Sequence, residues 1–198
     1  MNRRGQDRTG PLGGSGMVGL WGASSLIASV QTGTLSNAGG TTNTATIASV
    51  IPANCIVLTS WLTQANYASD QRNAYARIDL TNATTLTITI NFNAGYYTTC
   101  RYTVVEFMPG VIRSNQSGTI SVASGATSNT ATITSVNTAK SFVLPLGTTE
   151  DSNAVPPSSD PNAQWFTLTL TNATTVTALR NTAAAVNNVV GYQVVEFF

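Results

Sequence analysis

The chain has 198 residues, and nine lysines and arginines against eight aspartates and glutamates give it a formal net charge of +1. Only 9% of the residues are charged, so the chain lacks the surplus of basic side chains that generic nucleic-acid binding requires. The absence of histidine removes the commonest general base and the commonest metal ligand. Threonine fills 32 positions, and β-branched residues at this density favour strands over helices. We therefore expect an all-β protein.

The first 26 residues are expected to form an extended N-terminal arm. They are rich in glycine and have no core-forming pattern, and such a terminus becomes ordered only when something holds it. The arm carries basic side chains and apolar anchors, namely Arg3, Arg4, Arg8, Met17, Val18, Leu20 and Trp21. An arm of this composition can extend onto a negatively charged neighbour and insert an apolar side chain into a groove. The alternative is that residues 17–21 cap the first domain of the same chain.

From residue 27 onward the sequence contains an internal repeat. Residues 80–85 are identical to residues 170–175, and residues 104–107 recur as 194–197, both at an offset of 90. Earlier matches have shorter offsets: residues 31–34 match 116–119, and residues 43–50 match 129–136. Insertions are therefore expected near residues 36–42 and 147–163. We predict two domains, residues 27–108 and 109–198, joined directly at Met108-Pro109-Gly110.

Each domain contains short segments in which polar and apolar residues alternate with the period of two that is typical of half-buried strands. These segments are residues 44–50, 85–91, 130–136 and 166–170. Residues 102–107 are apolar on both faces up to Glu106, which is typical of a central strand covered on both sides. Turn-forming residues lie between the segments, at 37–40, 81–83, 124–125 and 155–158. The pattern predicts two tandem antiparallel β-sandwich repeats, Ig-like or jelly-roll-like.

The two cysteines, Cys55 and Cys100, each lie in an apolar, strand-like run. This position favours small, buried, free thiols, with a disulfide as the alternative in an oxidising compartment. No apolar run reaches the ~18 residues that a membrane-spanning helix requires, so no membrane partner is expected. Glycines at positions 19 and 22 interrupt the one stretch that resembles a signal peptide.

The first domain carries aromatic and arginine residues in its loops, and such residues are enriched in contact surfaces. The candidates for surface recognition, including stacking on sugars, are Trp61, Tyr67, Arg72, Tyr96 and Tyr97. The alternative is an ordinary exposed loop with one tryptophan in the core.

The carboxylates offer no catalytic pair. Glu106 and Glu196 occupy the same place in the two repeats, so we expect a structural role for both, such as an ion pair with an arginine or a strand-end hydrogen bond. Glu150, Asp151 and Asp160 supply oxygen ligands that suit Ca²⁺, but they lack the spacing of an EF-hand. A solvated loop is therefore preferred, and neither a cofactor nor a metal is expected.

The runs TATITSV at 130–136, LTN at 170–172 and GYQVVEF at 191–197 resemble a repeat seen in virion proteins of tailed bacteriophages. The resemblance is to β-domains of head-decoration, head-fibre and tail-associated proteins, and it covers nearly everything from residue 27 onward, twice. It implies a structural or adhesive role in the virion, which is assembled in the bacterial cytoplasm, and it supplies no catalytic motif. The partners it implies are other virion proteins, such as the major capsid protein or a tail or neck protein, and further copies of the chain in a homo-oligomer, by resemblance a trimer.

We therefore expect a non-enzymatic structural protein of a phage particle. Capsid decoration, or cement, and a head-fibre role are the preferred forms, with the N-terminal arm as the anchor. A tail-associated module that binds a receptor or a glycan is the alternative.

Overall fold

The computed structural model describes residues 26–37, 40–64, 76–90, 97–151 and 165–198. Over these ranges the chain is all-β: its strands pair in antiparallel fashion, and the helical elements are two 3₁₀ helices of three residues each. The all-β prediction is therefore confirmed. The described residues form no helix with the length and apolar character needed to span a membrane.

The same order of elements occurs twice along the chain. The first half contains β1 (Ile27–Ser36), β2 (Thr42–Thr46), η1 (Pro52–Asn54), β3 (Cys55–Gln64), β4 (Arg77–Asn82), β5 (Thr85–Thr89) and β6 (Tyr97–Phe107). The second half contains β7 (Ile112–Val122), β8 (Ser128–Thr132), η3 (Thr138–Lys140), β9 (Ser141–Asp151), β10 (Phe166–Asn172), β11 (Thr175–Arg180) and β12 (Asn187–Phe197). Between the halves, Gly110 has a φ of +86° and Val111 N–H donates to the Met108 carbonyl at 3.2 Å.

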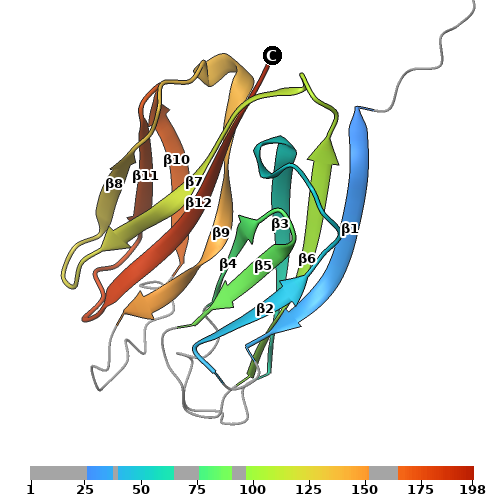
Figure 1. Ribbon diagram of the computed structural model, residues 1–198. Helices are drawn as coiled ribbons and strands as arrows, with labels where there is room; N and C mark the ends of the chain where they lie inside the picture. Colours follow the sequence, from blue (N-terminus) through green and yellow to red (C-terminus); the bar gives the residue numbers. More distant parts are fainter. Residues whose placement is uncertain (1–25, 38–39, 65–75, 91–96, 152–164) are drawn as a thin grey trace, which may run out of the picture.

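The strands form one large sheet and two small ones. The large sheet has six strands in the order β2-β5-β4-β9-β12-β7, and the small sheets have the orders β1-β6-β3 and β10-β11-β8. Each half therefore contributes three strands to the large sheet, and the halves join where Arg77 of β4 pairs with Gly147 of β9. The two small sheets lie on opposite sides of the large one (Figure 1).

Each half encloses its own apolar core. The second core takes alternate residues of β12, namely Val190, Tyr192 and Val194, together with Val176 and Ala178 of β11. The first core is built in the same way but also contains a residue of the second half, Leu146, which is 2% exposed. Burying a leucine side chain stabilises a fold by roughly 1.5–3 kcal/mol, so Leu146 ties the two halves together.

Three of the predicted strands end earlier than their alternating pattern indicates: the one expected over 85–91 ends at Thr89, and β2 and β8 end at equivalent positions. β2 ends at Thr46 and β8 at Thr132, so the expected strands over 44–50 and 130–136 are too long. A glutamine side chain takes over the backbone hydrogen bonds at this point. Gln31 accepts from Ala48 N–H at 2.7 Å and donates to the Ala48 carbonyl at 3.0 Å, and Gln116 makes the same two bonds with Thr134 at the same two distances.

The predicted turn at 81–83 is confirmed, as is its repeat. The Asn82 side chain accepts from Thr84 N–H at 2.9 Å, and Asn172 accepts from Thr174 N–H at 2.8 Å. These side chains close the hairpins β4–β5 and β10–β11, which is the ordinary role of asparagine in a turn. The turn at 124–125 is confirmed by Gly125, whose φ is +76°.

The acidic segment near residue 150 is not the solvated loop that the sequence predicts. Residues 147–151 extend β9, which pairs with β12 as far as Asp151 opposite Asn187. Glu150 is only 6% exposed. The segment is a strand because β9 goes on pairing with β12 through a stretch whose charged composition is typical of a loop. Asp160 lies outside the described residues.

Candidate functional site

Most of the side chains predicted to contact partners lie outside the described residues. These are Arg3, Arg4, Arg8, Met17, Val18, Leu20, Trp21, Tyr67, Arg72 and Tyr96. Trp61 lies in β3 opposite Cys100, and Tyr97 lies in β6 opposite Gln64, but their side chains are also outside the described part. The roles given to these residues remain predictions.

The two cysteines are free and buried, as the sequence predicts. Cys55 pairs with Glu106, whereas Cys100 pairs with Trp61, which is six residues further along β3. At about 3.3 Å per residue, this places the two Cα atoms about 20 Å apart, well beyond the ~7 Å limit for a disulfide. Burial raises the pKa of both thiols to about 12, and the nearby Glu106 carboxylate adds to the rise at Cys55.

The structural role predicted for the two repeated glutamates is confirmed. Glu106 accepts from Ile51 N–H at 2.8 Å and from the Ser29 hydroxyl at 3.0 Å. Glu196 accepts from Asn137 N–H at 3.1 Å and pairs with Arg113 at 3.3 Å. Each carboxylate therefore holds the segment that leads into a 3₁₀ helix.

The contact between the halves depends on two polar side chains that the sequence does not single out. Gln193 of β12 accepts from Val57 N–H at 3.0 Å and donates to the Cys55 carbonyl at 2.9 Å and to Asn115 Oδ1 at 3.0 Å. Asn115 of β7 donates to the Cys55 carbonyl at 2.6 Å and to the Pro52 carbonyl at 3.0 Å. The start of β3 and the adjacent η1 thus cover the outer face of β7-β12-β9.

The covered sheet makes β12 a strand buried on both faces. All of its residues from 190 to 196 are buried, which matches the pattern predicted for a central strand. The equivalent strand β6 is also central, in the order β1-β6-β3, but Arg101 is exposed and Thr103 half-buried. The expectation that residues 102–107 are covered on both sides is therefore wrong for part of β6, because no described element packs over that region.

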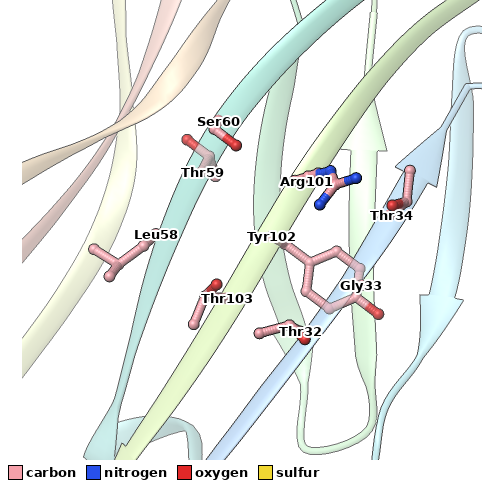
Figure 2. A pocket seen from close by; sticks show the side chains of 9 residues that line it. All are labelled: Thr32, Gly33, Thr34, Leu58, Thr59, Ser60, Arg101, Tyr102 and Thr103. Carbon is pink, nitrogen blue, oxygen red and sulfur yellow. The ribbon is translucent and has the colours of Figure 1, made fainter.

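The outer face of β1-β6-β3, over which none of the described elements packs, is the candidate functional site. A hollow of about 480 Å³ lies on it, lined by Thr32, Gly33, Thr34, Leu58, Thr59, Ser60, Arg101, Tyr102 and Thr103 (Figure 2). Directly paired residues share one face of a sheet, so the register places Thr103 between Thr32 and Leu58. Leu58 is 42% exposed. We call this surface the open face.

The side chains of the open face suit contact with the surface of another molecule. It offers threonine and serine hydroxyls, one exposed guanidinium and the exposed apolar side chain of Leu58, and it has no carboxylate among its lining residues. Among the described residues there is no group of three or more His, Cys, Asp or Glu that could hold a metal ion. The repeated strand reads RYTVVEF in β6 and GYQVVEF in β12. The two differences are Arg101 for Gly191 and Thr103 for Gln193, and both residues of β6 line the open face.

A second hollow, of about 520 Å³, lies on the other half, lined by Thr127, Trp165, Phe166, Thr167, Leu179, Arg180 and Asn181. Trp165 is 70% exposed and Leu179 is 50% exposed. Arg180 is 1% exposed, donates to the carbonyls of Ala123 and Ala126, and lies over the Phe166 ring at 5.7 Å. Burial lowers the pKa of this guanidinium. Its bonds to backbone carbonyls give it a structural role in the wall of the hollow.

Comparisons of the chain with protein-family models, with curated proteins and with solved structures find no match.

Proposed function

We propose that this protein is a non-enzymatic structural protein of a bacteriophage particle, built from two tandem antiparallel β-sandwich repeats over residues 27–108 and 109–198. Capsid decoration or a head-fibre role is the form we prefer. The partners are a major capsid protein or a tail or neck protein, together with further copies of the chain.

The structural role is supported by what the polar side chains shared by both repeats do: they make hydrogen bonds that hold the fold. Gln31 and Gln116 each accept a hydrogen bond from a backbone N–H at equivalent positions. Asn82 and Asn172 close equivalent hairpins. Glu106 and Glu196 accept hydrogen bonds from the backbone N–H that precedes each 3₁₀ helix. Duplication has thus preserved contacts that maintain the fold. A duplicated catalytic site would instead preserve side chains that converge on a cleft.

The placement on a phage particle is supported by the resemblance of residues 130–136, 170–172 and 191–197 to repeats of tailed-phage virion proteins. The anchor is proposed from composition: the arm over residues 1–26 combines Arg3, Arg4 and Arg8 with the apolar Leu20 and Trp21. Such an arm suits a negatively charged groove on a neighbouring virion protein.

Co-sedimentation tests this proposal. Full-length protein, a form lacking residues 1–26 and a full-length variant with Arg3, Arg4 and Arg8 all changed to Ala are mixed with particles stripped of the protein. A Lys140→Ala variant is the control, because it removes a positive charge far along the chain from the arm. We expect only the full-length and control proteins to sediment with the particles.

If all four forms sediment alike, the arm is not the anchor. If none binds particles but all bind host cells, the structural proposal fails, and the alternative of a receptor- or glycan-binding module replaces it.

A further inference from the structure

We propose that the open face of β1-β6-β3 binds the second half of another copy of this chain, head to tail. The bound surface of that copy is the side of its second half that carries β10, a free edge strand, and the start of β9, which pairs with β12 and touches β4 through the single pair Arg77–Gly147; we call it the β9/β10 side. This contact gives the assembly role proposed above a partner and a surface. It rests on the proposed function only in taking further copies of the chain as partners.

The chain already makes this contact once, between its own two halves. The equivalent side of the first half, where β3 and β4 form the edges, packs on the outer face of β7-β12-β9 through Gln193, Asn115 and Leu146. Each half has both surfaces because the halves repeat the same strands. The outer face of β1-β6-β3 and the free edge of β10 are therefore left over.

The order of the strands in the sheets supports the same contact between copies. The six-stranded sheet joins the triple β2-β5-β4 to the triple β9-β12-β7. The two small sheets are the remaining triples, β8-β11-β10 and β3-β6-β1, and their edge strands β10 and β3 correspond to β4 and β9. Docking would pair β10 of one copy with β3 of the next and continue a six-stranded sheet across the contact. Such pairing also covers exposed sheet edges, which natural β-proteins protect.

Side-chain sizes at the two surfaces are also matched. Within the chain, Arg77 lies against Gly191, where an added Cβ would come 2.6 Å from the Arg77 Cδ atom. The repeat places Thr167 at the position of Arg77 and Arg101 at the position of Gly191. In the internal contact the docking side carries the arginine and the receiving face carries the glycine. In the contact between copies the receiving open face carries Arg101, and the β9/β10 side carries the smaller Thr167, which leaves room for it.

Docking would also remove exposed apolar side chains from water. Val30 is 54% and Leu58 is 42% exposed on the open face, and Trp165 is 70% exposed where the chain enters β10. Val30 and Thr103 take the places of Asn115 and Gln193. The contact between copies therefore depends more on apolar burial and less on hydrogen bonds than the internal one does. Exposed tryptophan is among the residues that most often dominate binding energy in interfaces.

Purified full-length protein, without particles, tests the proposal by sedimentation velocity over a range of concentrations. We expect the wild type to form species larger than the 20.6 kDa chain. Thr167→Arg should weaken association by at least about tenfold, because it sets two arginines against each other. The double variant R101G/T167R should restore association, since it recreates the internal Gly191–Arg77 pair. The control Thr44→Arg, at an exposed position of β2, should assemble like the wild type.

Thr167→Arg should not unfold the protein, because the first half carries arginine at the same position. A second blocking variant, Thr32→Arg, acts from the open face. Because the contact joins two different surfaces, mixing the T32R and T167R variants should give a dimer that grows no further, although each alone stays monomeric.

Three results would overturn the proposal: a wild type that stays monomeric, a T167R variant that assembles like the wild type, or an R101G/T167R variant that does not recover. Failure of this interface is distinguishable from failure of the proposed function, because binding to particles is measured separately with the arm variants.

Discussion

Gln193 provides the sharpest test of how the two halves are held together. Its side chain is 4% exposed and makes three hydrogen bonds at the contact between the halves. Replacing it with methionine keeps the length and removes the polar atoms. The Val57 N–H is then left buried without the acceptor it uses, which costs about 1–3 kcal/mol. The Cys55 carbonyl loses less, because Asn115 still donates to it at 2.6 Å.

With the net loss of the remaining hydrogen bonds, at roughly 1 kcal/mol, we expect Gln193→Met to lower the free energy of unfolding by about 2–4 kcal/mol. Urea denaturation measures this change. With a slope near 2 kcal/mol per molar urea, the midpoint should fall by about 1–2 M. Thr103→Val is the matched control: it removes a polar group at the equivalent position of the uncovered strand and should change stability by less than about 0.5 kcal/mol. Equal losses in the two variants would refute the asymmetry between the halves.

Four further predictions concern the fold. Gly118→Ala should lower the free energy of unfolding by about 1–3 kcal/mol, because the added methyl group would lie 2.7 Å from the hydroxyl of the buried Tyr192. Thermal unfolding measures the loss. The comparison variant is Gly125→Ser, where nothing lies within 4 Å but φ is +76°, so that it separates crowding from backbone strain. Cys55 and Cys100, with pKa values of about 12, should not react with a thiol reagent at pH 7.5 until denaturant is added, and reaction of the native protein would contradict their burial. The unfolded thiols ionise above pH 9 and the folded ones do not, so stability should fall by about 1.4 kcal/mol per pH unit for each thiol between pH 9 and 12, and a double Cys→Ala variant should lose that part of the slope. Glu106→Gln should destabilise the fold by about 1–2 kcal/mol in urea denaturation, since its carboxylate accepts from Ile51 N–H and the Ser29 hydroxyl, and an unchanged midpoint would show that these bonds are not needed.

Local features of the fold were readable in the sequence. Asn82 and Asn172 act within two residues of their own position, and a turn of that kind depends on chemistry that is visible in a short segment. The free, buried cysteines followed from their apolar surroundings. The repeat itself was visible as identity of residues, and the two halves have the same order of elements.

What the sequence could not supply is which surface each half presents to the other. The strands RYTVVEF and GYQVVEF differ at only two positions, yet one is buried on both faces and the other is partly open. The difference depends on contacts between Gln193 and the start of β3, which lies 136 residues away. Burial of Glu150 was missed for the same reason, because pairing of β9 with β12 carries the strand through a charged stretch. Contacts of this range leave no periodic pattern in a single segment.

The central claim is that the open face receives the β9/β10 side of another copy, and the position of a single cross-link tests it most directly. The internal pair Arg77–Gly147 corresponds to Thr167 of one copy opposite Ser60 of the next, and directly paired strand residues have Cα atoms about 4.5–5.5 Å apart, which suits a disulfide. Under mild oxidation, the S60C/T167C variant should form a ladder of covalent multimers on a non-reducing gel. On the same gel, each single variant, S60C or T167C, should run as a monomer when oxidised alone, and a mixture of the two should give covalent dimers and nothing larger. Absence of the ladder, or dimers from either single variant alone, would contradict the head-to-tail contact.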